Sequence, residues 1–162
     1  MPDPGGGGAP SGAPASPLVL GFDFGERRIG VAAGGAASGG ARPLGVVACR
    51  SGVPDWAALG RHVADWRPGL LVVGVPYNMD GTPGRLTAAA LAFAAELGRR
   101  AALPAVTVDE RLSSREAEDI LRRQRASGER SRRVRRGDVD AMAACVLLEQ
   151  WLRGTVPAPP NE

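Results

Sequence analysis

Short apolar runs separated by polar turns fill the middle of this chain. Continuous or alternating apolar residues predict five strands, over 18–23, 28–34, 44–49, 70–75 and 105–108. Apolar residues at helical spacing predict helices over 54–66, 83–102 and 138–153. The first three strands are close enough to form an antiparallel meander, with a loop over 35–43. The strand–helix units that follow predict an α/β domain, a mixed sheet with helices on both faces.

The two ends of the chain differ from this middle part. Residues 1–17 are rich in Gly and Pro, and residues 155–162 resemble them. We expect a disordered leader over 1–17, one domain over 18–154 and a disordered tail over 155–162, because such segments bury too little apolar surface to fold. The leader lacks the pattern of a signal peptide, and no apolar run reaches the ~18–20 residues that span a bilayer. We therefore expect a cytoplasmic protein without membrane contact.

Charge and residue usage narrow the chemistry. All 20 basic residues are Arg, and eight of them lie between Arg122 and Arg136. Guanidinium groups bind phosphate in a bidentate manner, so this segment, which includes Arg132 and Arg133, predicts salt-sensitive contact with nucleic acid without base specificity. The chain has one His, which argues against zinc-hydrolase and Ser-His-Asp chemistry. Cys49 and Cys145 are predicted to be buried free thiols.

Three acids stand at the edges of apolar elements: Asp23, Glu110 and Asp140. Carboxylates that converge on one rim of a sheet offer hard oxygen ligands to Mg²⁺ or Mn²⁺. Two such ions can activate water and stabilise the leaving oxygen in phosphodiester cleavage. Asp109 and Glu110 are adjacent, so strand alternation turns them to opposite faces and only one can be a ligand. Taken alone, an Asp-x-Gly sequence is more commonly a turn, and Asp23 would then be a turn former bonded to backbone amides.

Four motifs, over 23–32, 73–81, 109–114 and 139–148, resemble the YqgF family. Its members are Holliday-junction-resolvase-like nucleases, linked to pre-16S rRNA, with a ribonuclease-H-like fold. The resemblance, over about 18–153, implies a mixed five-stranded sheet in the order 3-2-1-4-5 with strand 2 antiparallel. It also implies that Asp23, Glu110 and Asp140 form an acidic triad holding one or two Mg²⁺ or Mn²⁺ ions, and it favours Glu110 over Asp109.

The leading hypothesis is a metal-dependent endonuclease that hydrolyses phosphodiester bonds in 5′-end processing of pre-16S rRNA. Two alternatives stay open: a nuclease for branched DNA, and a non-catalytic RNA-binding factor of ribosome assembly. A sugar-kinase or actin-like ATPase would share the Asp-x-Gly turn but needs a second domain, for which 162 residues leave no room. A junction resolvase should be a two-fold dimer, whereas an RNA processor can be a monomer.

Four further residues have a functional and a structural interpretation. Arg27 would leave a cation near the triad, and Arg111 could contact phosphate or form a structural ion pair. Asn78 follows a central strand and is a candidate substrate contact, although Asn-Met-Asp-Gly is also an ordinary turn sequence. Asp138 fits a helix N-cap better than a metal ligand.

Overall fold

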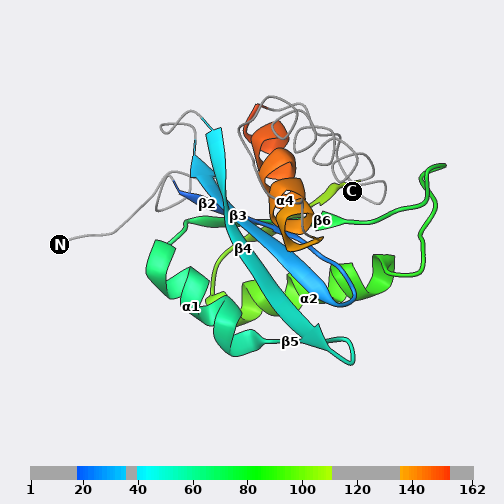
Figure 1. The fold of residues 1–162 in the computed structure, drawn as a ribbon, viewed down its shortest axis with the longest axis horizontal. Helices are drawn as coiled ribbons and strands as arrows, with labels where there is room; N and C mark the ends of the chain where they lie inside the picture. The colour runs from blue at the N-terminus through cyan, green and yellow to red at the C-terminus, as the bar shows by residue number, and fades with distance from the viewer. Residues whose placement is uncertain (1–17, 36–39, 111–135, 154–162) are drawn as a thin grey trace.

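The computed structural model of this chain describes residues 18–35, 40–110 and 136–153. The predicted leader and the tail lie outside these ranges. The described residues form a six-stranded mixed sheet in the order β5-β4-β3-β2-β6-β7 (Figure 1). The strands are β2 (Val19–Asp23), β3 (Arg28–Gly35), β4 (Gly40–Arg50), β5 (Val53–Pro54), β6 (Leu70–Val75) and β7 (Ala105–Asp109).

The five predicted strands and their order are confirmed. β2 is antiparallel to β3 and parallel to β6, and β6 is parallel to β7. The sheet differs from the expectation in one extra strand, because the two residues of β5 pair with the end of β4.

The predicted loop over 35–43 is wrong in its second half. β4 already begins at Gly40 and pairs with β3 through a register shift between Val31 and Ala32. Gly45 has φ +136°, a conformation that Gly adopts without strain, and this irregularity lets the strand run past Pro43.

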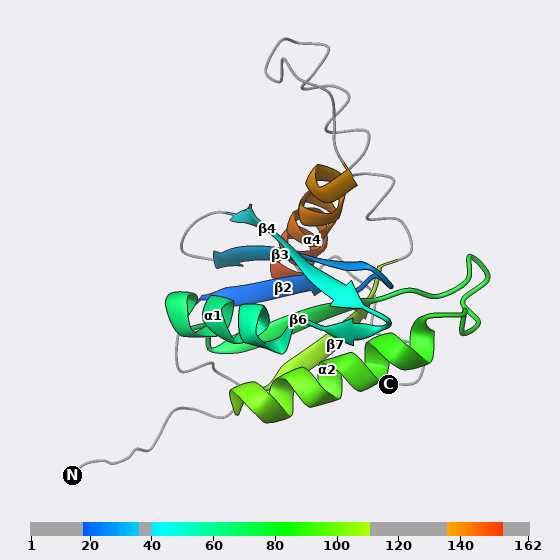
Figure 2. The same cartoon turned by 60° about the horizontal axis from the view of Figure 1, so that its bottom comes forward.

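Helices cover the two faces of the sheet. α1 (Trp56–Trp66) and α2 (Thr87–Ala101) lie on one face, and α4 (Arg136–Leu152) lies on the other (Figure 2). All three predicted helices are present. α1 begins where Asp55 accepts a hydrogen bond from the Ala58 amide at 3.1 Å, as an N-cap residue does.

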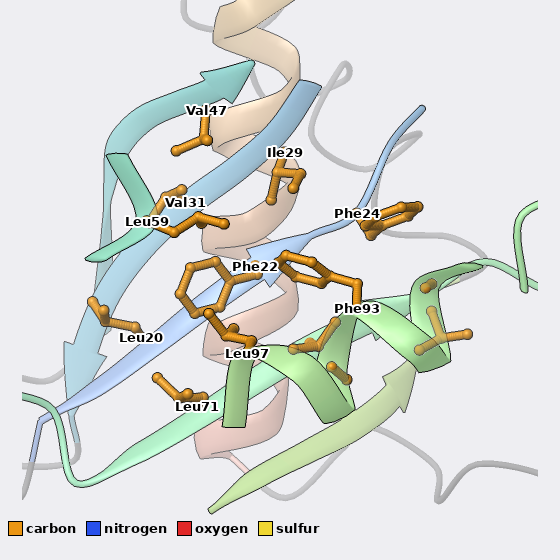
Figure 3. Close-up of a cluster of buried hydrophobic side chains, with 14 of the residues drawn as sticks. Leu20, Phe22, Phe24, Ile29, Val31, Val47, Leu59, Leu71, Phe93 and Leu97 are labelled. Atoms are coloured by element: carbon orange, nitrogen blue, oxygen red, sulfur yellow. The ribbon is translucent and has the colours of Figure 1, made fainter. Parts of the chain in front are cut away.

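The larger core lies between the sheet and the helices α1 and α2. Leu20 and Phe22 of β2 point into it, and Phe93 of α2 packs edge-on against Phe22 (Figure 3). Trp56 stacks on Phe93, and Arg100 lies 4.3 Å above the Trp56 ring, so the two helices are joined by their aromatic contacts. The tryptophan therefore belongs to the core, as its helical spacing predicts.

A smaller core lies between the sheet and α4. Leu148 packs against Gly21, where an added β-carbon would lie 3.1 Å from the leucine β-carbon. Cys145 is buried in this core and donates from Sγ to the carbonyl oxygen of Ala41 at 3.1 Å. Cys49 is buried on the other face, and both thiols are free, as predicted. In the described part of the chain, no helix is long and apolar enough to cross a membrane.

Candidate active site

Asp23 ends β2 on the face that α4 covers. Its side chain is buried, with 7% of its surface exposed. In the sheet it pairs with Gly30 of β3 on one side and Gly74 of β6 on the other. Asp23 is therefore the only residue of this three-strand row that carries a side chain. The space that two side chains would fill is left for groups that come from β7 and α4.

Glu110 fills the space above Gly74. It continues β7 by one residue, since its amide donates to the carbonyl of Val75 at 3.3 Å. A β-carbon added to Gly74 would lie 2.7 Å from Leu147 Cδ2 of α4 and 3.1 Å from the β-carbon of Glu110. Glu110 thus lies on the α4 face, the side on which Asp23 lies.

The carboxyl groups of Asp23 and Glu110 hydrogen-bond to each other. Burial, followed by the negative charge of Glu110, raises the pKa of Asp23 well above its ordinary value. Burial also raises the pKa of Glu110, against the lowering effect of the Asp23 hydrogen bond. Two carboxylates buried side by side repel each other, so the pair favours a protonated carboxyl group over two charged ones.

Asp140 lies on α4, close enough to act on this pair. Its negative charge contributes to the raised pKa of Asp23. Its Oδ2 accepts a hydrogen bond from Arg28 Nε at 2.7 Å, in a partly exposed ion pair. The main chain of Asp140 rests on Gly30, where an added β-carbon would lie only 1.9 Å from the Asp140 carbonyl oxygen. Gly30 therefore allows α4 to bring this acid to the sheet.

The donor set suits a hard divalent cation. A cation bound by Asp23 and Glu110 would relieve the repulsion of two buried carboxylates. The third acid, Asp140, accepts a hydrogen bond from Arg28, and within the described ranges no group of three or more His, Cys, Asp or Glu side chains is arranged to hold a metal ion. The structure thus presents a two-carboxylate site with Asp140 beside it.

The structure places the other candidate residues in different surroundings. Arg27 is exposed in the turn between β2 and β3, and the arginine that pairs with Asp140 is its neighbour Arg28, which sequence reasoning missed. The alternation of β3 carried a signal, since Arg28 lies two residues before Gly30 and so on the same face. Arg111, Arg132 and Arg133 lie outside the described residues.

Asn78 belongs to a loop with its own hydrogen bonds. Its Nδ2 donates to Thr82 Oγ1 at 3.0 Å and to the Pro83 carbonyl at 3.2 Å, so both amide hydrogens are used inside the loop. The buried Thr87 ties the loop to α2, accepting from the Gly84 amide and donating to the Pro76 carbonyl. Asn78 therefore sets the shape of the loop that follows β6.

The expected N-cap role of Asp138 is wrong. Asp138 lies inside α4, which already includes Arg136, so it is not the residue that caps the helix.

The chain matches known proteins over nearly its whole domain. The model of the RuvX family, described as Holliday junction resolvase, matches residues 17–154. A relative from Azotobacter vinelandii, named "Putative pre-16S rRNA nuclease", is 49% identical over 135 residues, which cover 83% of this chain and 92% of that protein. A relative of the same name from Xanthomonas campestris pv. campestris is 50% identical over 134 residues, covering 83% and 86%.

Solved structures agree in fold. RuvC of T. thermophilus, in complex with a Holliday junction substrate, superimposes with a TM-score of 0.51 at 19% identity, over 87% of this chain and 98% of that one. Sequence identity this low shows the fold alone, a ribonuclease-H-like mixed sheet. With the sequence match, the outcome is unambiguous: the chain belongs to the RuvX family.

Proposed function

We propose that this protein is a metal-dependent endonuclease that hydrolyses phosphodiester bonds at the 5′ end of precursor 16S rRNA. The observation that carries the proposal is the buried, hydrogen-bonded carboxyl pair of Asp23 and Glu110, with Asp140 beside it at the same rim. Burial of two carboxyl groups side by side destabilises a fold, and such groups are concentrated at functional sites. The relatives named for pre-16S rRNA support the choice of RNA. An rRNA substrate also supports a cytoplasmic location.

Asp23 and Glu110, joined by Asp140, would hold one or two Mg²⁺ or Mn²⁺ ions. When bound, these ions supply an activated water and charge stabilisation for the leaving oxygen. The residues of the chain form the site for these ions. Asp23 and Glu110 offer the buried carboxylate oxygens that would bind the cations. Gly30 and Gly74 keep the row free of side chains, so that Asp140 of α4 and Glu110 can lie beside Asp23.

In the proposal, residues around the acidic rim contact the substrate. Arg27 is exposed in the turn directly after β2, where a guanidinium can reach phosphate. The loop that Asn78 shapes follows β6, and Arg85 from this segment pairs with Glu26 of the turn at 3.2 Å. Arg111, Arg132 and Arg133 extend the proposed contact with the phosphate backbone. None of these contacts reads a base, so the shape of the substrate would decide its choice.

Substitution of Asp23 tests the proposal. We expect Asp23→Asn to abolish cleavage of a precursor 16S fragment in Mg²⁺ or Mn²⁺ while binding of the fragment survives. Asp65→Asn is the matched control, because Asp65 is exposed on α1, on the other face of the sheet, and should leave cleavage unchanged. Metal-dependent cleavage by the Asp23 variant at the wild-type rate would refute the proposal. RNA binding without cleavage by the wild-type protein would instead favour a non-catalytic assembly factor.

A second candidate function is cleavage of branched DNA, which the description of the family supports. A junction resolvase cuts two strands symmetrically and should act as a two-fold dimer. Competition between a precursor 16S fragment and a four-way DNA junction in one reaction would decide between them, with the oligomeric state measured at the same protein concentration. Preferred cleavage of RNA by a monomer supports rRNA processing, and paired cuts by a dimer support junction resolution.

A further inference from the structure

Arg28 connects β3 to the acid of α4. It is the first residue of β3 and shares a face with Gly30, two positions further on. Its Nε donates to Asp140 Oδ2 at 2.7 Å, across 112 positions of the chain. The main-chain carbonyl of Asp140 lies on Gly30. β3 therefore holds Asp140 at two points, its main chain at Gly30 and its carboxylate at Arg28.

The geometry of this ion pair is that of an orienting contact. The hydrogen bond engages Oδ2, and the guanidinium and the carboxylate keep 30% and 27% of their side-chain surface exposed. Partly exposed ion pairs add little to stability because water competes for both charges. Carboxylates that bind metals are commonly held by a second residue, which fixes their direction. Arg28 is placed to do this for Asp140.

We propose that Arg28 is a positioning residue, which holds the carboxylate of Asp140 in the direction needed to bind a divalent cation next to Asp23 and Glu110. This inference rests on the proposed function, since it presupposes a cation at the acidic rim. It assigns to Arg28 a task different from phosphate binding. A guanidinium committed to Asp140 acts on the substrate only through that acid.

The test measures Mn²⁺ binding directly, by isothermal titration calorimetry on the full-length protein without nucleic acid. We expect Arg28→Gln to weaken Mn²⁺ binding by about 10- to 100-fold, the range found when a residue supporting a metal ligand is lost. The Mn²⁺ affinity of Arg28→Lys should lie between those of the wild type and Arg28→Gln, because an ammonium keeps the charge but not the fixed position of Nε. Arg50→Gln is the matched control: it removes the same charge from an exposed residue of β4 and should bind Mn²⁺ like the wild type.

A double-mutant cycle shows whether Arg28 acts through Asp140. The weakening caused by Arg28→Gln should disappear when Asp140 is already Asn, because there is no carboxylate left to position. A full loss that persists in the Asp140→Asn background would overturn the proposal. Thermal unfolding in EDTA distinguishes a positioning role from a merely structural one. If the ion pair is only structural, Arg28→Gln lowers the melting temperature without changing the Mn²⁺ affinity. That result would also overturn the proposal.

Two other outcomes contradict the proposal in distinct ways. Tighter Mn²⁺ binding by Arg28→Gln would mean that Arg28 competes with the cation. Unchanged Mn²⁺ affinity with a raised KM for nucleic acid would mean that Arg28 binds phosphate. In both cases the proposed nuclease function stands if the wild type cleaves.

If the wild type binds Mn²⁺ through Asp23 but cleaves nothing, the nuclease proposal fails, while the Mn²⁺ affinities of the variants still decide the role of Arg28. If the wild type binds no Mn²⁺, both fail.

Discussion

The carbonyl oxygen of Asp140 lies where the β-carbon of any other residue at position 30 would be, at 1.9 Å from the place of that atom on Gly30. The contact joins the first turns of α4 to the middle of the sheet, main chain against main chain. No side-chain rearrangement can make room for a methyl group there, because the obstacle is the backbone of a helix.

Gly30→Ala should therefore destabilise the protein and remove its cleavage activity. Overpacked positions cost about 1–3 kcal/mol, and a backbone obstacle places this one at roughly 3 kcal/mol. Urea unfolding followed by circular dichroism measures the change. Gly60→Ala is the control: nothing lies within 4 Å of the added β-carbon in α1, so the free energy of unfolding should rise by about 0.5–1 kcal/mol. Equal stability of Gly30→Ala and wild type would contradict the contact.

Gly74→Ala should affect catalysis more than stability. The added β-carbon meets the flexible end of Leu147 at 2.7 Å and the Glu110 side chain at 3.1 Å, and both can move aside. We expect a loss of about 1 kcal/mol in the free energy of unfolding. Displacement of Glu110 by a few tenths of an ångström should lower kcat by about tenfold, since misplacement by 1 Å can cost about 100-fold. A variant as active as wild type would show that Glu110 need not lie above Gly74.

The carboxyl pair predicts an unusual dependence of stability on pH. The pKa of Asp23 is raised in the folded protein, so the native state binds its proton more tightly than the unfolded chain. The contribution of Asp23 to the stability of the metal-free protein should be fully present below the ordinary pKa of an aspartate and should be lost as the pH rises through the raised folded pKa. Glu110, whose pKa is also raised, acts in the same direction.

Asp23→Asn should remove most of this fall. In EDTA at neutral or alkaline pH we expect the variant to be more stable than wild type, and at about pH 3 the difference should shrink, because Asp23 is then mostly protonated in both states. Chemical unfolding at a series of pH values measures it. Asp65→Asn, at an exposed position, should follow the wild-type curve. A wild type that gains stability relative to Asp23→Asn as the pH rises would show that the pair is not buried in this way.

Cys145 should resist thiol reagents in the folded protein. Burial, followed by the charge of Glu149, raises its pKa to about 12, and its Sγ donates to the Ala41 carbonyl. Because the thiolate is the reactive form, almost none is available at pH 8. Labelling with a chromogenic disulfide should therefore release no signal from Cys145 until denaturant is added. Comparison with Cys145→Ser assigns the slow thiol, and rapid labelling of the native protein at this position would contradict its burial.

Much of the fold could be predicted from hydrophobic patterning. The apolar run that ends at Asp23 and the fully apolar run of β6 are local signals, and their strands lie side by side in the sheet. The alternation that turns Asp109 and Glu110 to opposite faces is local as well. The start of β4 was missed because Pro43 reads as a turn residue, whereas the bulge in the β3–β4 pairing makes its place in the strand possible.

The site was harder to predict, because its contacts depend on pairing between distant segments. Arg28 and Asp140 are 112 positions apart, and nothing near either residue indicates the other. Gly30 and Gly74 look like ordinary small residues of a strand. Their meaning depends on the register that places them on both sides of Asp23, which is a property of the folded sheet.

The dependence of the acidic rim on α4 also determines when the site can exist during synthesis. Asp23 leaves the ribosome early, and Glu110 follows after the strands that flank it. Asp140 comes more than 100 positions after Arg28, its partner in β3. A growing chain can therefore pair Asp23 with Glu110 while it still lacks the third acid and the helix that covers this face. In the proposed function, a nuclease that acts on ribosomal RNA would be made by ribosomes in a form that cannot cut until its last helix has docked.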